Sequence, residues 1–211
     1  INYQYVLDSL VSSEKMMIGG KEYYIKGNPL VSKQITFEGH LVPDKSVTNF
    51  VTMGRMSPEK DQKKLIEAFA KVYERNKDIA LYIIGTGELE DELHALIESY
   101  GLTDQIHMVG QLANPFPLIG DCDCFVLPSN HEGQPMVLLE CLILNKPIIA
   151  TDIPGNRSVL EGGYGHIVEN NVNGLVDGMV KFLEGQLAFE KFDYKTYNQE
   201  AVDMFYQYAT V

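Results

Sequence analysis

The chain has 211 residues, of which 45% are hydrophobic and 22% are charged, a composition typical of globular rather than disordered proteins. Seventeen basic and 29 acidic residues give a net charge of −12, which argues against a nucleic-acid surface because such a surface needs a basic stripe to neutralise phosphates. No apolar run approaches the roughly 18 residues of a membrane span, and no signal-peptide pattern opens the sequence. The cysteines Cys122, Cys124 and Cys141 are odd in number and lie in or beside apolar runs, which favours a reducing compartment over a disulfide framework.

Residues 1–45 are interrupted by Gly19-Gly20, Gly27-Asn28-Pro29 and Pro43. This pattern predicts a helix, a strand and a linker rather than a complete domain. The chain also starts with Ile1 and not with Met, so we expect it to be a fragment of a longer protein.

Short apolar runs rich in β-branched residues follow and predict buried strands. They are Thr48–Met53, Ile79–Ile84, Ile106–Val109, Cys124–Leu127, Pro147–Ala150 and Gly165–Val168. Segments with helical spacing lie between them, marked by Leu65, Phe69 and Val72, by Leu89, Leu93, Leu96 and Tyr100, and by Val137, Leu138 and Cys141. The alternation predicts an α/β fold, a doubly wound Rossmann-like parallel sheet with helices on both faces.

In such a sheet, ligands bind beyond the carboxyl ends of the strands, in the loops that lead into helices. These loops are predicted at Gly54–Asp61, Gly85–Glu88, Gly110–Pro117, Pro128–Gln134 and Thr151–Asn156. The first contains Arg55 and Lys60, and two cations beside a helix start suit a diphosphate. The alternative, which the loop alone favours, is a helix capped by Ser57 with Pro58 at its first position and ordinary surface charges.

The second loop, Gly85-Thr86-Gly87-Glu88, has glycines that allow a backbone or a ligand to approach closely. It lacks the third glycine of a dinucleotide-binding motif. Acidic residues at Glu88, Glu90, Asp91 and Glu92 favour the start of the next helix but oppose a phosphate there. We expect a structural turn first and a wall of the cleft second.

The segment Asp121-Cys122-Asp123-Cys124 has the spacing of a metal-binding pair. Alternation along a strand would place the two cysteines on one face and the two aspartates on the other, and no histidine is nearby. We therefore expect a helix end followed by a buried strand, without a metal.

Glu132 and Glu140 stand eight residues apart, the first in a polar loop and the second in the apolar helix that follows. Two carboxylates would then face one cleft, with backbone N–H groups between them. A loop glutamate and a surface helix glutamate are common, so the spacing alone is a weak signal.

An apolar stripe closes the chain and consists of Tyr194, Tyr197, Ala201, Met204, Phe205 and Tyr208. Its spacing predicts a terminal helix that covers the sheet. The alternative is that the stripe docks on a further domain.

Several of these segments together resemble a known family. The run Glu132–Glu140 is similar to the E-x7-E motif of retaining glycosyltransferases of family 4 (group 1), which have the two-domain GT-B fold. Gly54-Arg55 with Glu59-Lys60-Asp61 resembles the diphosphate loop of that family, Ile84–Gly87 its second-strand turn, and Pro147–Asp152 with Pro154-Gly155 the stretch after the motif. The resemblance covers roughly residues 48 to 185 in the same order and at the same spacing.

The resemblance implies the carboxy-terminal, donor-binding half of a GT-B enzyme that transfers a sugar from a nucleoside diphosphate sugar to a glycan, lipid or protein. Residues 1–45 would be a remnant of the amino-terminal domain and linker, with Gly27-Asn28-Pro29 resembling the interdomain turn. Residues 46–188 would bind the nucleotide-sugar and 189–211 would form a crossover helix. This chain alone is then expected to bind donor and transfer little, because the site closes between two domains.

Arg55 and Lys60 would hold the diphosphate and stabilise the departing nucleotide, so neither a metal nor a cofactor is implied. Glu132 would lie beside the donor sugar, Glu140 would accept hydrogen bonds from the ribose, and the base would lie against Gln111 and Leu112. The remaining implied donor-binding residues are Gly54, Gly85, Gly87, Gly133, Gln134, Met136 and Val137. The family expectation is a front-face displacement rather than a pair of catalytic carboxylates about 5 Å apart.

One departure from the family is Gln134-Pro135, where members usually carry Phe-Gly, so that Pro135 lacks one N–H for a ligand. Two other functions stay open: a GT-B nucleotide-sugar epimerase that uses His131, and a non-catalytic α/β binding module. The implied partners are a nucleotide-sugar and an acceptor, with no nucleic acid. We expect a cytoplasmic location, with peripheral association at the inner face of the membrane left open.

Overall fold

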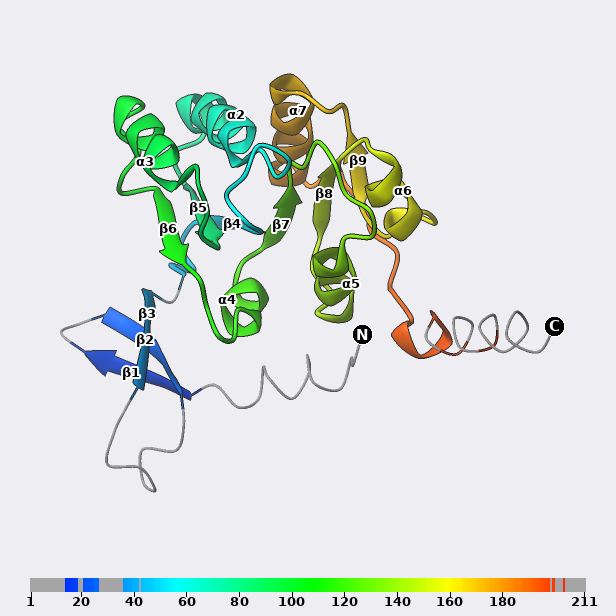
Figure 1. Ribbon diagram of the computed structural model, residues 1–211, viewed down its shortest axis with the longest axis horizontal. Helices are drawn as coiled ribbons and strands as arrows, with labels where there is room; N and C mark the ends of the chain where they lie inside the picture. Colours follow the sequence, from blue (N-terminus) through cyan, green and yellow to red (C-terminus); the bar gives the residue numbers. More distant parts are fainter. Residues whose placement is uncertain are drawn as a thin grey trace.

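The computed structural model of the protein describes residues 14–18, 21–26, 36–41, 43–197, 199 and 203. Within these residues the strands form two sheets, one of three antiparallel strands and one of six parallel strands (Figure 1). The smaller sheet contains, in order, β1 (Glu14–Ile18), β2 (Lys21–Lys26) and β3 (Thr36–Leu41).

The smaller sheet corrects the prediction for residues 1–45, which expected one strand where the structure has three. β2 pairs with both neighbours, and Met16 lies opposite Tyr23. Cross-strand pairing stabilises such strands, so the composition of a run such as Glu14–Ile18 does not reveal it. The predicted helix at the start of the chain and the turns Gly19-Gly20 and Gly27-Asn28-Pro29 lie outside the described residues.

The larger sheet is built by alternating strands and helices. In chain order its elements are β4 (Thr48–Met53), α2 (Gln62–Arg75), β5 (Ile79–Ile84), α3 (Glu90–Ser99), β6 (Ile106–Gly110), α4 (Phe116–Asp121), β7 (Cys124–Leu127), α5 (Met136–Ile143), β8 (Ile148–Thr151), α6 (Pro154–Leu160), β9 (His166–Val168) and α7 (Val172–Leu183). The six predicted strands are confirmed, with ends that differ by one residue at most.

Two predicted loops already contain the start of a helix. The loop 110–117 runs into α4, and the loop 151–156 runs into α6. These helices have six and seven residues, which is too short for a helical period to stand out in the sequence. Both begin with proline in the first turn, a position where the missing N–H costs nothing.

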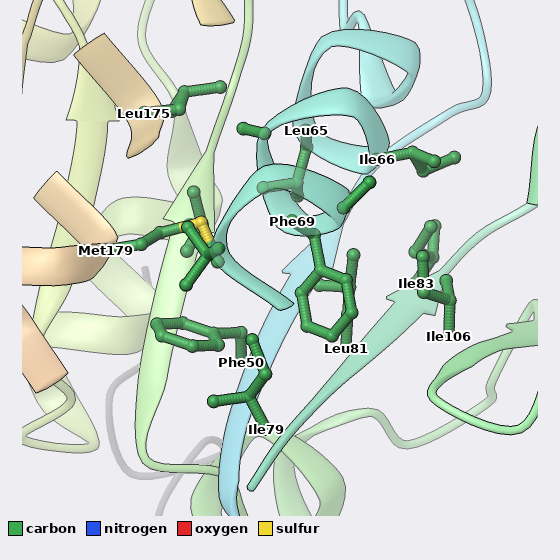
Figure 2. Packing of buried hydrophobic residues seen from close by; sticks show 14 of the residues in the cluster. Phe50, Leu65, Ile66, Phe69, Ile79, Leu81, Ile83, Ile106, Leu175 and Met179 are labelled. Atoms are coloured by element: carbon green, nitrogen blue, oxygen red, sulfur yellow. The ribbon is translucent and has the colours of Figure 1, made fainter. Parts of the chain in front are cut away.

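The helices cover the sheet on both faces. Figure 1 shows α2, α3 and α7 on one side and α4 and α5 on the other. The apolar cluster of Figure 2 lies between the sheet and the helices α2, α3 and α7. In it, Phe69 and Met179 from the helices meet Phe50 and Leu81 from the strands. Because helices press on both faces, β5 is buried at every position, as expected for a central parallel strand. No helix in the described part of the chain is long and apolar enough to cross a membrane.

The segment Asp121–Cys124 is the end of α4 followed by β7, as predicted. The expectation that the two cysteines share a face is wrong: Cys122 belongs to the cluster on the α4 and α5 side, and Cys124 to the cluster on the α2 and α7 side. The reason is that Cys122 caps the end of α4 and lies before the strand, so the alternation of side chains along β7 does not extend to it. Asp123 instead accepts a hydrogen bond from the backbone N–H of Asn49 on β4, at 2.7 Å.

The start of the terminal stripe packs on the sheet domain. The ring of Phe192 is buried and lies 5.3 Å from the rings of both Tyr164 and Tyr197. Tyr194 packs against the cluster on the α5 side, as the covering interpretation predicts. The remaining stripe residues, Ala201, Met204, Phe205 and Tyr208, lie outside the described residues.

The packing predicts how the core responds to truncation. Leu81→Ala removes a fully buried side chain between α2 and the sheet and should lower the free energy of unfolding by about 2–5 kcal/mol. Tyr100→Ala, at a side chain that is 46% exposed beyond α3, should change it by less than about 0.5 kcal/mol. Denaturant unfolding of the three proteins measures both values, and equal effects would contradict this assignment of the core.

Candidate functional site

The site lies where the direction of the sheet connections reverses. The strand order is β6-β5-β4-β7-β8-β9, so the chain runs outward from β4 on one side and outward from β7 on the other. The loops after these two strands therefore leave in opposite directions. The region between the two loops, called the crevice below, is the place where ligands bind in such sheets. The two loops are 54–61 and 128–134, which contain the predicted cations and the first predicted carboxylate.

Glycines let the loops after β4 and β5 touch backbone to backbone. Gly85 adopts a φ of 129°, and a Cβ atom there would overlap the carbonyl oxygen of Gly54. A Cβ atom on Gly87 would likewise overlap the backbone of Met56. The backbone N–H of Gly54 donates to the oxygen of Ile84 at 3.0 Å, which extends the sheet ladder into the loops. The predicted close approach at this turn is confirmed, and only glycine permits it.

An open pocket of about 590 Å³ lies along these loops, within the size range of small-molecule sites. Six residues of the predicted site line it: Gly54, Arg55, Gly85, Gly87, Gln111 and Leu112. Three further residues that line the pocket, Met53, Ile84 and Thr86, were not assigned as binding residues from the sequence, although Ile84 and Thr86 lie in the predicted second-strand turn. Their signal was their position, since Met53 and Ile84 end their strands and Thr86 stands between two glycines.

A cation and a carboxylate meet across the crevice. Lys60 Nζ lies 2.5 Å from Glu132 Oε1, and the hydroxyl of Ser129 donates to the same oxygen at 2.7 Å. The Glu132 side chain is only 9% exposed, whereas that of Lys60 is 27% exposed. The predicted diphosphate-binding Lys60 and the predicted sugar-binding Glu132 thus bridge the loops after β4 and β7.

Arg55, the other cation that was predicted to hold the diphosphate, occupies a different environment. Its guanidinium lies 3.2 Å from Glu88 Oε2, and its side chain is 73% exposed. The structure therefore gives Arg55 and Lys60 separate carboxylate partners. An exposed pair of this kind contributes little stability, so another anion can readily replace Glu88.

The helix that follows the cations starts later than the Ser57 alternative expects. α2 begins at Gln62, and its N-cap is Asp61, whose side chain accepts the backbone N–H of Lys64 at 3.1 Å. Ser57 instead closes a turn, since its carbonyl oxygen accepts the N–H groups of Lys60 and Asp61, both at 3.1 Å. The cap at Ser57 is wrong because Asp61 offers a carboxylate at the point where the chain enters the helix.

A buried polar stack supports Glu132 from below. The hydroxyl of Thr151 donates to the Ser129 carbonyl oxygen at 2.6 Å, and the Asn156 amide donates to the Thr151 carbonyl oxygen at 2.9 Å. Gly155 packs so closely that an added Cβ atom would overlap the carbonyl oxygen of Glu132. The sequence interpretation did not assign Ser129, Thr151 or Asn156 to the site. The available signal was a serine and a threonine at the ends of two neighbouring buried strands.

Five predicted donor-binding residues occupy the loop and first turns around the start of α5: Gly133, Gln134, Met136, Val137 and Glu140. The first three are exposed, and the last two are half-buried. Pro135 directly precedes α5, where its carbonyl oxygen accepts the N–H of Leu138 at 3.0 Å. The N–H groups of Met136 and Val137, at the first two positions of α5, have no carbonyl partner within the helix and can meet a ligand. Burial raises the pKa of the Glu140 carboxyl above its ordinary value.

Comparison with known proteins places this site in a family. The family model of the glycosyl transferases group 1 matches residues 33–199, which is most of the chain. The chain belongs to the glycosyl transferases group 1. The group 1 membership that the motifs indicated is thereby confirmed.

Curated relatives of this group 1 chain share part of its length. An uncharacterized glycosyltransferase of Methanocaldococcus jannaschii, MJ1059, is 38% identical over 112 residues, which cover 53% of the chain and 28% of that protein. The alpha-D-kanosaminyltransferase of Streptomyces kanamyceticus is 32% identical over 133 residues, covering 62% of the chain and 34% of that protein. The chain thus spans about a third of the length of the curated relatives it matches.

Solved structures confirm the fold. TarM of S. aureus, in a complex with UDP, alpha-GlcNAc-glycerol and Fondaparinux, matches with a TM-score of 0.62 and 25% identity over 70% of this chain and 31% of TarM. HepE of Anabaena, in a complex with UDP, matches with a TM-score of 0.66 and 22% identity over 77% of this chain and 49% of HepE. The group 1 chain therefore has the Rossmann-like α/β fold of GT-B glycosyltransferases.

The contact beneath Glu132 predicts a local requirement for glycine. Gly155→Ala should destabilise the protein by about 1–3 kcal/mol, because the added methyl group overlaps the Glu132 carbonyl oxygen and the loop must move. Gly133→Ala is the matched control, since a Cβ atom there meets nothing within 4 Å. Thermal or denaturant unfolding measures both, and similar stabilities of the two variants would contradict the packing.

The burial of Glu140 predicts a pH-dependent cost. Because its pKa is raised in the folded state, folding is unaffected below the unfolded pKa of roughly 4.3 and loses stability as the pH rises through the folded pKa. Glu140→Gln should therefore gain stability relative to the wild type as the pH is raised from about 4 to about 7. Unfolding at several pH values tests this, with Glu98→Gln at an exposed position of α3 as the control. A difference between Glu140→Gln and wild type that stays constant with pH would refute it.

Proposed function

We propose that this chain is the donor-binding domain of a retaining glycosyltransferase, which transfers a sugar from a nucleoside diphosphate sugar to a glycan, lipid or protein acceptor. The observation that carries the proposal is the Lys60–Glu132 bridge at the strand-order reversal, beside an open pocket lined by the glycine loops. Membership of the glycosyl transferases group 1 supports the reaction class. The complex of TarM with UDP supports a nucleoside diphosphate as the donor moiety.

In this proposal the pocket holds the nucleoside. Leu112 and the ends of β4 and β5 provide apolar surface for a base, and the backbone around Gln111 provides hydrogen-bonding groups. Glu140 accepts the ribose hydroxyl groups, which replace the water that burial has removed from its carboxylate. The ribose thus lies between the pocket and α5.

The diphosphate then lies between Arg55 and Lys60. Binding changes the anionic partner of each cation. A phosphate replaces Glu88 as the partner of Arg55, and a phosphate either joins Glu132 as a second partner of Lys60 or replaces it. The two cations stabilise the charge that develops on the departing diphosphate, which is the work that a metal performs in other phosphate-binding sites. We propose that no metal is needed.

Glu132 turns to the donor sugar once Lys60 engages the phosphate. Its carboxylate accepts hydrogen bonds from sugar hydroxyl groups, while Ser129 continues to hold it by a hydrogen bond. The N–H groups of Met136 and Val137 meet sugar or phosphate oxygens at the positive end of α5. The sugar is thereby oriented for attack by an acceptor from the face on which the phosphate leaves.

The proposal predicts nucleotide binding that depends on both cations. UDP, GDP, ADP and CDP are titrated into the chain by calorimetry to measure their dissociation constants. At 100 times its dissociation constant, the nucleotide that binds best should raise the free energy of unfolding by roughly 2.7 kcal/mol. Arg55→Ala and Lys60→Ala should each weaken binding about tenfold or more, since each removes a charged hydrogen bond to phosphate. EDTA should leave binding unchanged.

Matched controls come from the same helix region. Arg75→Ala, at the far end of α2, and Lys71→Ala, at an exposed position of α2, remove the same charges away from the crevice and should bind like the wild type. The proposal fails if none of the four nucleotides binds, if the two control variants lose as much affinity as Arg55→Ala and Lys60→Ala, or if EDTA abolishes binding.

A further inference from the structure

A buried lysine stands next to the proposed donor site without taking part in it. Lys64 is the third residue of α2 and only 7% exposed, which is rare for a lysine. Its ammonium donates to Asn130 Oδ1 at 2.7 Å and to Asn170 Oδ1 at 2.5 Å, and lies 3.3 Å from Asp61 Oδ2. Three donors thus face three oxygen acceptors, so the ammonium has no capacity left for a ligand.

The acceptors of Lys64 are linked to one another. The Asn130 amide donates to Asp61 Oδ2 at 2.9 Å, and the backbone N–H of Asn130 donates to the Glu59 carbonyl oxygen at 2.7 Å. Lys60 is therefore flanked on both sides by residues that bond to Asn130. Asp61 also holds a left-handed backbone with a φ of 45°, a conformation that a non-glycine residue keeps only when its surroundings fix it.

The other end of the bridge starts from the same residue. Glu132 follows Asn130 by two positions, so Asn130 sets where the loop after β7 begins to approach Lys60. Asn170 adds the loop after β9, directly before Asn171, which caps α7 by accepting the N–H of Gly174 at 2.8 Å. Lys64 thus ties together three loops at the carboxyl edge of the sheet.

A buried ammonium is an expensive way to hold loops together. Desolvation lowers the pKa of Lys64 below its ordinary value, and the Asp61 carboxylate opposes that shift. Replacing buried charges by apolar groups is often neutral or stabilising, so stability alone gives little reason for a lysine here. A need for fixed geometry gives a better reason for the lysine. Directed hydrogen bonds set the spacing of the loops, whereas apolar packing would leave that spacing loose.

We propose that Lys64 is a positioning residue, which fixes the loop of Lys60 against the loop of Glu132 so that the two side chains meet in the crevice. Its consequence for catalysis rests on the proposed function, whereas the geometric role does not. In this proposal Lys64 itself does not contact the nucleotide-sugar.

The decisive test measures the coupling between Lys60 and Glu132 without any nucleotide. A double-mutant cycle of Lys60→Met and Glu132→Gln, read by denaturant unfolding, gives the factor by which the pair changes the unfolding constant. We expect about fivefold or more in the wild-type background. The cycle is then repeated with Lys64→Met, which keeps the length of the side chain, and with Lys71→Met, whose lysine lies on the same helix and donates to Asn173 at 3.3 Å.

The coupling should fall to about onefold with Lys64→Met and stay unchanged with Lys71→Met. If Lys64 merely stabilised the fold, Lys64→Met would lower the stability of all four proteins of the cycle equally and leave the coupling between Lys60 and Glu132 intact. That result would overturn the proposal. Asn170→Ala removes one exposed acceptor and is expected to fold if Lys64→Met does not; it should reduce the coupling in the same direction, and an unchanged coupling there would equally overturn it.

Nucleotide affinity provides a second measurement. With the nucleotide that binds best, Lys64→Met should weaken binding about tenfold while Lys71→Met does not. If the wild type binds no nucleotide, the proposed function fails and the coupling test still decides the role of Lys64. If the wild type binds and Lys64→Met binds equally well with its coupling intact, the positioning role fails and the donor site stands.

Discussion

The adjacency of β4 and β7 is the constraint on which the site depends. These two strands are neighbours in the sheet, yet the chain leaves them in opposite directions, so no connection covers the gap beyond their carboxyl ends. The two loops that flank this gap are joined by the Lys60–Glu132 pair and by the hydrogen bond from the backbone N–H of Asn130 to the Glu59 carbonyl oxygen. A sheet with the same strands in sequential order would have no such opening, and Lys60 and Glu132 would lie on separate surfaces.

The loops and helix starts around this opening carry several features that lower stability. Glu140 is half-buried with a raised pKa, Lys64 is a buried cation, and Asp61 has a left-handed backbone. Among the described residues, three side-chain oxygens are buried without a hydrogen-bond partner. Those of Gln62 and Asn156 belong to residues that support the loops of the crevice, whereas that of Asn49 lies at the opposite end of β4. Most of these features gather around the crevice, and such a gathering is typical of a functional site.

The predictability of the structure follows from how local each signal is. The strands are found because runs such as Ile79–Ile84 are apolar throughout and of the right length. The cations and the first carboxylate are found because each lies in a loop that follows a strand. α4 and α6 are too short to show a period, and the antiparallel strands β1 to β3 depend on partners rather than on composition. The Lys64 network joins residues 61, 64, 130 and 170, so nothing short of the folded chain could have shown it.

The charges of the site also suggest why a nucleotide-sugar, rather than any anion, would suit it. Both cations already have carboxylate partners, in a chain whose net charge of −12 repels anions in general. Inorganic diphosphate could replace Glu88 and Glu132 at the cations, but it would leave the nearly buried Glu132 without the partner that compensates its charge. A donor that binds as proposed supplies hydroxyl groups from its sugar to Glu132 and from its ribose to Glu140. Each part of the donor then meets a group of the site: the diphosphate meets the two cations, the sugar meets Glu132 and the ribose meets Glu140. Selectivity therefore arises from this replacement of hydrogen-bond and ion-pair partners as much as from the shape of the pocket.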